Sequence, residues 1–275
     1  MDTHTFHASD GTRLVYADCG KPDGPAVVLC HGLGAGAAQF GADAAWLSER
    51  GYRVLVPDLR GHGASGTPPE PEQLSYSLDR LARDQIEMLD HAGMGRVHWA
   101  GNSLGGIIGL VLAAHHPERL ASLATFGTAL SLDLPAWTGR MVTLFDAVPG
   151  RAITARMTAW STTRNRTARP LVEHLLGQYD GRAVAAITDT VRRYDLTSAA
   201  TGWAGPGLVL VGGRDAAVNR ALRPQLAALR DRRNWRVAEL PEGGHCANLD
   251  ATEDWRAALV SFWREAAASS PAGAS

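Results

Sequence analysis

The sequence predicts an α/β protein with a doubly wound, mostly parallel sheet that is flanked by helices and carries a helical insertion. Two observations predict this class. Short apolar segments of strand length alternate with longer segments of helical periodicity, and this alternation stops near residue 127 and resumes near residue 204. We therefore expect an α/β core formed by residues 1–126 and 204–268, and a helical insertion, called the cap, formed by residues 127–203. The small-residue tail, residues 269–275, is expected to be disordered.

Most of the predicted strands are short apolar runs bounded by turn residues. Residues 14–18 alternate between apolar and polar side chains, which is typical of an edge strand. Residues 26–30 form a continuous apolar run, which is typical of a strand buried on both faces. The further segments with strand character are residues 53–57, 96–100, 120–125, 207–211 and 235–240.

The predicted helices lie between these strands. Residues 37–50 end at Gly51, and residues 104–116 end at Pro117. Residues 77–91 carry apolar side chains at helical spacing. The remaining helical segments are residues 219–230 and 252–268. Strands that alternate with helices in this way predict a parallel sheet.

Composition and charge argue against several kinds of partner. The formal net charge is −1 and Lys21 is the only lysine, so nothing indicates binding to nucleic acid or to an anionic membrane surface. The N-terminus lacks the features of a signal peptide, and no apolar run approaches transmembrane length. Cys19, Cys30 and Cys246 are odd in number and far apart, which does not suit a disulfide framework or a metal site. We expect a cytoplasmic, cofactor-free protein with no nucleic-acid or membrane partner, and leave open whether it forms a homodimer.

The stretch around Ser103 joins a predicted strand to a predicted helix. So sharp a turn forces its central residue toward positive φ and brings the residues two before and two after it into close contact. Gly101 and Gly105 occupy those two positions, where any side chain would collide. The turn would lift the Ser103 hydroxyl clear of the sheet, beside the free N–H groups of a helix N-terminus. The pattern predicts a nucleophilic serine, although a glycine-rich junction with an incidental serine has the same five residues.

A serine hydroxyl needs a base to take its proton and a third group to orient that base. Asp215 and His245 each follow a predicted strand, at the strand end where α/β sheets bind ligands. Their order along the chain, Ser103, Asp215, His245, is one of the known orders of a serine–acid–histidine triad. Asp58 and Asp133 are competing acids, and we favour Asp215 over Asp133 because it directly follows a strand.

Two further glycine-rich loops carry polar side chains. Asp58, Arg60 and His62 occupy a tight loop after a buried strand, and we expect them to bond backbone groups of that loop. His31 begins the loop 31–36, which lacks the glycine spacing and the Lys-Ser/Thr pair of phosphate-binding loops. We expect this second loop to bring backbone N–H groups to the site.

Together these motifs resemble the α/β-hydrolase superfamily, and nearly the whole chain takes part. The resemblance is carried by His31-Gly32, Asp58-x-x-Gly61-x-Gly63-x-Ser65 and Gly101-x-Ser103-x-Gly105-Gly106, followed after the cap by the loops of Asp215 and His245. It implies an eight-stranded type of sheet and gives Asp58 a structural role.

The resemblance also implies roles for individual residues. Ser103 would be the nucleophile, His245 the general base and then general acid, and Asp215 the residue that orients His245. The backbone N–H groups of Leu33 and Leu104 would form an oxyanion hole, and such donors stabilise the transition state by several kcal/mol.

The Gly-Asn-Ser-Leu-Gly-Gly form of the turn is similar to small carboxylesterases, enol-lactone hydrolases and the C–C hydrolases of aromatic ring-cleavage products. A serine at this turn disfavours haloalkane dehalogenase and epoxide hydrolase chemistry, for which the family uses an aspartate. Cys246 and Ala247 stand where the C–C hydrolases usually have an aromatic residue. We expect a serine hydrolase of small carboxylic esters or lactones that works through an acyl-enzyme. The alternatives are a C–C bond hydrolase, an acyltransferase or perhydrolase on the same triad, and a small-molecule receptor with a slow triad.

Large apolar and basic residues are interspersed in the cap. Residues such as Trp137, Phe145 and Trp160 suggest an apolar or aromatic acyl pocket, and packing of the cap against the core accounts for them equally well. The basic residues considered as a clamp for a substrate carboxylate are Arg140, Arg151, Arg156, Arg164 and Arg166. A solvated face suits most of these arginines better.

Overall fold

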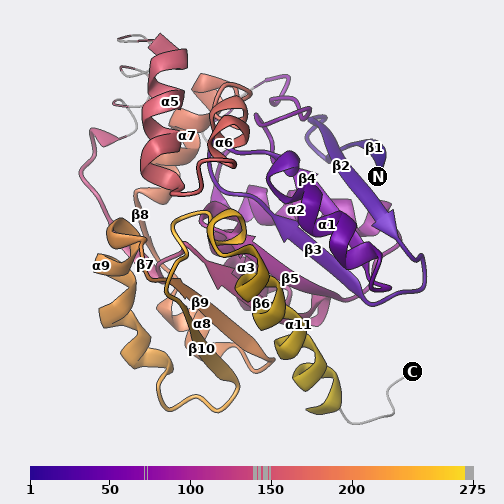
Figure 1. Ribbon diagram of the computed structural model, residues 1–275. Coiled ribbons are helices and arrows are strands. Elements are labelled where there is room, and N and C mark those ends of the chain that lie inside the picture. The colour runs from indigo at the N-terminus through magenta and orange to yellow at the C-terminus, as the bar shows by residue number, and fades with distance from the viewer. Residues whose placement is uncertain are drawn as a thin grey trace.

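The computed structural model describes residues 1–70, 72, 74–138, 141, 144, 148 and 150–269. An eight-stranded sheet runs through the molecule, with helices on both faces and a group of helices at one end (Figure 1). The predicted disordered tail lies outside the described residues, except for Ser269. Within the described ranges, no helix combines the length and the apolar character needed to cross a membrane.

The strands of the sheet are β1 (Asp2–His7), β2 (Arg13–Gly20), β3 (Ala26–Cys30), β4 (Arg53–Asp58), β5 (Val97–Asn102), β6 (Leu120–Phe126), β9 (Gly207–Gly212) and β10 (Trp235–Leu240). Their order across the sheet is β1-β2-β4-β3-β5-β6-β9-β10. In this order, the six strands from β4 to β10 run parallel to one another. The strand β2 is antiparallel to both of its neighbours, β1 and β4. The predicted mostly parallel sheet is therefore present.

The edge of the sheet differs from the prediction. Residues 14–18 lie within β2, which pairs with β1 on one side and β4 on the other, so this segment is not an edge strand. The edge strand on this side of the sheet is β1, in which Phe6 is the only buried residue. A strand of polar residues with one buried side chain has too little hydrophobic pattern to be recognised in the sequence.

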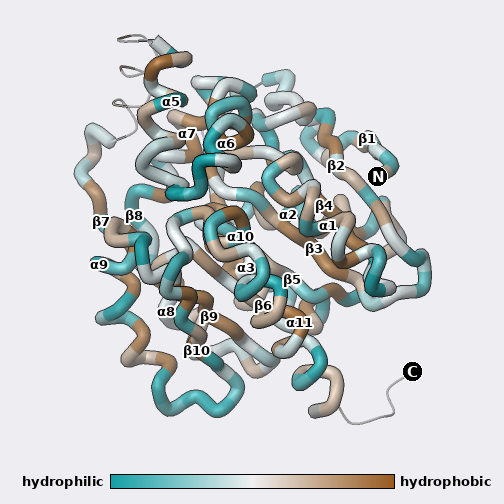
Figure 2. Tube along the Cα trace, viewed as in Figure 1, coloured by the Kyte–Doolittle hydropathy of each residue, from teal (hydrophilic) through white to brown (hydrophobic). Residues whose placement is uncertain are grey.

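Helices cover both faces of the sheet because each presents an apolar side to it. On one face lie α2 (Leu78–His91), α3 (Leu104–His115) and α9 (Ala216–Gln225), which contribute to one core cluster. On the other face lie α1 (Gly41–Ser48) and α11 (Thr252–Ser269), which contribute to a second cluster. Figure 2 shows the apolar stretch along β3 between these layers. The short helices η1 (Ala37–Phe40), η2 (Pro117–Arg119), η4 (Leu226–Leu229) and α10 (Ala247–Asp250) complete the core.

The insertion between β6 and β9 forms a separate helical group. It contains α5 (Arg151–Thr162), α6 (Arg169–Leu175) and α7 (Gly181–Val191), which lie together at one end of the molecule (Figure 1). The antiparallel pair of β7 (Ser131–Asp133) and β8 (Arg193–Asp195) brings the two ends of this group together. The next helix, α8 (Thr197–Gly202), contacts α3, so the predicted cap range includes one helix that packs on the core.

Candidate active site

The turn between β5 and α3 holds Ser103 in a strained backbone conformation. Ser103 has φ 50° and ψ −112°, and it is the only non-glycine residue with positive φ in the described part of the chain. A Cβ atom on Gly101 would lie 2.2 Å from the carbonyl oxygen of Gly105, and one on Gly105 would lie 2.2 Å from that of Cys30. No side chain fits at such distances, so the geometry requires both glycines.

His245 and Asp215 form a hydrogen-bonded pair beyond the ends of neighbouring strands. The Nδ1 atom of His245 lies 2.8 Å from Oδ2 of Asp215. Because an ionised carboxylate only accepts hydrogen bonds, Nδ1 carries the proton and Nε2 keeps a free lone pair. Asp215 is buried, and its Oδ1 accepts a hydrogen bond from the Val218 N–H as the N-cap of α9. The structure thus brings together the acid and the base that the sequence pairs.

Ser103 and His245 line one cavity of about 280 Å³. Among the contacts of the described residues, no hydrogen bond joins the Ser103 hydroxyl to the His245 ring. Hydrogen bonds of catalytic groups are often long in a free enzyme and shorten when the substrate binds. The two side chains therefore share one space in which a bound substrate would contact both.

The backbone N–H groups of Leu33 and Leu104, which lie near Ser103, have no acceptor within the described ranges. Leu104 is the first residue of α3, and the first N–H groups of a helix have no partner inside it. Leu33 follows Gly32, where a Cβ atom would lie 3.2 Å from the Cβ of Ser103. Both donors are therefore free for a substrate oxygen, as the predicted oxyanion hole requires.

Uncharged polar side chains and aliphatic side chains line most of the cavity. The core contributes Gln39, Asn102 and Cys246 besides Ser103 and His245, and the cap contributes Thr158, Thr162, Val172, Leu175 and Leu176. Burial raises the pKa of the Cys246 thiol to about 12, so this cysteine is an uncharged part of the wall. The described lining contains no arginine, lysine or carboxylate.

None of the described cap residues considered for an aromatic acyl pocket or a carboxylate clamp lines the cavity. Trp137 and Trp160 are 59% and 57% exposed, and neither lines the cavity. Four of the arginines considered as a carboxylate clamp are also absent from the cavity lining: Arg151, Arg156, Arg164 and Arg166. Arg140 and Phe145 lie outside the described residues. The apolar wall comes instead from aliphatic side chains in and beside α6. This helix is too short to give a distinctive hydrophobic pattern in the sequence.

The competing acids and histidines have structural partners. Asp58 accepts hydrogen bonds from the backbone N–H groups of Ala37 (2.7 Å) and Ala64 (2.9 Å), which joins the two glycine-rich loops. His31 is fully buried, and its Nε2 accepts from the Leu59 N–H at 3.0 Å. Asp133 is exposed on β7 and lies 3.8 Å from the Arg193 guanidinium. None of these three side chains contacts His245 within the described ranges.

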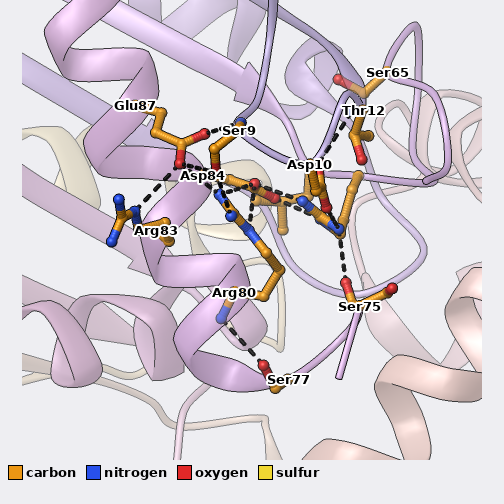
Figure 3. A network of polar contacts seen from close by, with 12 residues as sticks. Ser9, Asp10, Thr12, Ser65, Ser75, Ser77, Arg80, Arg83, Asp84 and Glu87 are labelled. Atoms are coloured by element: carbon orange, nitrogen blue, oxygen red, sulfur yellow. Dashed lines mark hydrogen bonds and ion pairs between the residues drawn. The ribbon is translucent and has the colours of Figure 1, made fainter. Parts of the chain in front are cut away.

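Arg60 belongs to a buried ionic network away from the cavity. Its guanidinium is fully buried, with Nε 2.6 Å from Asp84 and Nη1 2.9 Å from Asp10. Figure 3 shows this network, in which Arg80 also reaches Asp84 and Glu87. An ionic group buried in this way is satisfied by its partners, so Arg60 fixes its loop and takes no part in the site.

A buried amide cluster supports the site from behind, and no motif in the sequence predicts it. The Asn102 amide donates to the carbonyl oxygen of His245 at 2.9 Å, which links the serine turn to the histidine loop. Gln39 donates to the side-chain oxygens of Asn102 (3.0 Å) and Asn248 (3.2 Å). Asn248 in turn donates to the buried Asp43 carboxylate at 2.9 Å. Residues more than 200 positions apart meet here, and amides carry no local pattern that would reveal it.

This chain is similar to known proteins over most of its length. A protein of Variovorax paradoxus that is named as a proposed carbamate hydrolase, RutD, is 30% identical over 260 residues, which cover 90% of this chain and 95% of that protein. The 3-oxoadipate enol-lactonase 2 of Acinetobacter baylyi is 30% identical over 216 residues, which cover 77% of this chain and 79% of the enzyme.

Solved structures show the same architecture. The enol-lactonase of Burkholderia xenovorans has a TM-score of 0.83 at 25% identity, and the match covers 95% of this chain and all of that chain (100%). The profile of the α/β hydrolase fold family matches residues 25–252. With its eight-stranded sheet, its serine turn after β5 and its full-length relatives, this chain belongs to the α/β hydrolase fold family and is a hydrolase of that fold.

Proposed function

We propose that this protein hydrolyses small carboxylic esters or lactones, with Ser103 as nucleophile, His245 as base and Asp215 as the residue that orients the base. The observation that carries the proposal is the Asp215–His245 hydrogen bond at the wall of the cavity that Ser103 also lines. The bond fixes the His245 tautomer that leaves Nε2 free to accept a proton.

In the proposed first half-reaction, the Ser103 hydroxyl attacks the carbonyl carbon of the ester while its proton passes to Nε2 of His245. The oxygen of the tetrahedral intermediate accepts hydrogen bonds from the Leu33 and Leu104 N–H groups. The intermediate then collapses, the bond to the leaving oxygen breaks, and His245 gives its proton to that oxygen.

In the second half-reaction, water attacks the acyl carbon of the Ser103 ester. His245 takes a proton from this water and returns it to the Ser103 oxygen when the acyl bond breaks, which releases the carboxylic acid. With a lactone, the alcohol and the acid are parts of one molecule, so a single ring-opened product leaves.

The small, uncharged lining supports this substrate class. A cavity of about 280 Å³ is at the lower end of the range for ligand sites, which favours a compact acyl group. The absence of a cation from the described lining favours a neutral substrate over one with a second carboxylate. The similarity to an enol-lactonase supports ester-type bonds, and the similarity to a proposed carbamate hydrolase makes a small carbamate a useful comparison substrate.

The proposal is tested by steady-state kinetics on p-nitrophenyl acetate, a short-chain lactone and a small carbamate. We expect the ester or the lactone to have the highest kcat/KM, and Ser103→Ala and His245→Ala to lower kcat by about 10⁴-fold or more. Circular dichroism and thermal unfolding would show that both variants fold. Equal turnover by wild type and Ser103→Ala would refute the proposal.

A further inference from the structure

Helix α5 has its small residues on the inside and its large apolar residues on the outside. Ala155 and Ala159 are buried against the protein. Ile153, Met157 and Trp160, spaced at helical intervals of four and three, are 51%, 65% and 57% exposed. A cap helix held only by hydrophobic packing would present these faces the other way round. The three exposed residues are called here the outer face of α5. The Arg169 guanidinium lies 4.1 Å from the centre of the Trp160 ring, yet more than half of each of the three side chains stays exposed.

The surroundings of this face are strongly basic. Residues 150–172 contain five arginines and no aspartate or glutamate. Three of these arginines, Arg156, Arg164 and Arg166, are exposed, and their guanidinium groups have no carboxylate partner in the described ranges. The chain's net charge of −1 conceals this local excess, because the acidic residues lie elsewhere. A helix with exposed Trp, Met and Ile beside arginines has the composition of a segment that lies in a membrane–water interface.

We propose that the outer face of α5 binds an anionic lipid surface. The apolar side chains would enter the boundary between headgroups and acyl chains, and the arginines would contact the anionic headgroups. An anionic lipid surface accounts for both the exposed apolar side chains and the arginines. A symmetric contact with a second copy would instead place the same arginines opposite each other. The sequence alone favours no membrane partner, because only the structure shows which apolar residues of the cap are exposed.

The position of α5 gives such binding a consequence for the cavity. Thr158 and Thr162 line the cavity from the inner side of the same helix whose outer side carries Met157 and Trp160. One helix therefore separates the cavity from the proposed lipid surface. If the proposed hydrolase activity holds, substrates dissolved in a lipid phase would be delivered next to the cavity. Lipid binding itself does not depend on that activity.

Sedimentation with vesicles tests the proposal directly. We expect the protein to bind vesicles of phosphatidylglycerol, to bind phosphatidylcholine vesicles much more weakly, and to lose binding as the salt concentration rises. The triple variant Ile153→Ser, Met157→Ser, Trp160→Ser should lower partitioning onto phosphatidylglycerol about 100-fold. The triple variant Arg156→Gln, Arg164→Gln, Arg166→Gln should lower it to a similar extent, about 100-fold.

Control variants carry changes of the same chemical kind elsewhere on the surface. Leu74→Ser removes an apolar side chain that is 72% exposed, and Arg230→Gln, Arg232→Gln, Arg233→Gln removes the same charge from another exposed segment. We expect these controls to bind vesicles like the wild type. All variants should turn over dissolved p-nitrophenyl acetate at the wild-type rate, because none of the altered residues lines the cavity.

Three outcomes would overturn the proposal. The first is no binding of the wild type to either kind of vesicle, and the second is equal loss of binding in the arginine control, which would indicate diffuse charge attraction. The third is a wild-type dimer, measured by light scattering, that the α5 variants convert to a monomer, which would make a second copy the occupant. If the wild type had no esterase activity, the proposed function would be refuted, but the vesicle experiment would still test lipid binding.

Discussion

Ser103 adopts a backbone conformation that is open to it only because the residues two before and two after it, Gly101 and Gly105, are glycines. The sequence was sufficient to predict this, since a strand, a helix and two glycines at fixed spacing all point to the same turn. The pairing of His245 with Asp215 was also predictable, because each residue lies in the loop after one of two successive parallel strands, β9 and β10. The amides of Gln39 and Asn102 were not, because their partners depend on the tertiary structure alone.

Substitution of Gly105 tests how tightly the turn is packed. Gly105→Ala should lower the free energy of unfolding by about 4 kcal/mol or more, because its Cβ would overlap the Cys30 carbonyl group. Gly95→Ala is the matched control, since no atom lies within 4 Å of a Cβ at that position, and it should change stability by less than about 1 kcal/mol. Urea unfolding measures both values, and similar values for the two variants would contradict the described geometry.

Asp215→Asn separates the proposed catalytic role of this residue from its structural one. Asparagine is as good an N-cap as aspartate, so α9 should keep its start and the unfolding temperature should change little. The amide cannot hold His245 in the required tautomer or stabilise its charged form, so kcat on p-nitrophenyl acetate should fall by about 10³-fold or more. A kcat within a few fold of wild type would remove Asp215 from the proposed mechanism.

At the scale of elements, the parallel strands and their helices were predictable and the edge and the cap were not. Buried strands such as β3 are continuous apolar runs, so each carries its own signal. By contrast, β1 is mostly exposed and is held by its pairing with β2. The inverted arrangement of α5 could not be predicted either, because the sequence shows which residues share a helix face but not which face is covered.

Asp250 connects the cap to the histidine loop. Its Oδ1 accepts hydrogen bonds from the Thr163 hydroxyl and from the Arg164 and Asn165 N–H groups, and its Oδ2 accepts from the Gly244 N–H at 2.9 Å. Gly244 precedes His245, so this one carboxylate holds the end of α5 against the loop of the proposed base.

Asp250→Ala should therefore disturb the site as well as the fold. We expect a loss of about 2–3 kcal/mol in the free energy of unfolding, since four donors lose a charged acceptor. We also expect kcat/KM to fall about tenfold, because the cap wall and His245 are no longer held together. Asp231→Ala, an exposed carboxylate without a described partner, is the control. An unchanged kcat/KM in a less stable Asp250→Ala protein would show that the link serves stability alone.

At the scale of the whole molecule, two buried histidines make the fold sensitive to acid. Burial lowers the pKa of His31 to about 4 and that of His62 to about 3, whereas an exposed histidine titrates near 6.5. His62 stays neutral because its Nε2 accepts the Gly34 N–H at 2.9 Å. Between about pH 6.5 and pH 4, the unfolded chain binds more protons than the folded protein, so stability rises with pH in this window and is lost as the pH falls.

His62→Gln tests this linkage, because glutamine keeps an acceptor for the Gly34 N–H but cannot titrate. Between pH 4 and 6, the free energy of unfolding of the wild type should rise more steeply with pH than that of the variant. The slopes should differ by about 1.4 kcal/mol per pH unit. Denaturant unfolding at several pH values measures both slopes, and parallel curves would show that His62 does not contribute.

The proposed mechanism requires a covalent bond between the Ser103 oxygen and the acyl group of the substrate. Mass spectrometry of the protein quenched during turnover of p-nitrophenyl acetate would detect this bond. We predict an acetyl group on the peptide that contains Ser103, and none on that peptide in Ser103→Ala, which should also lack turnover. The mechanism would be refuted if Ser103→Ala hydrolysed the ester at the wild-type rate and the wild type carried no acetyl group on Ser103.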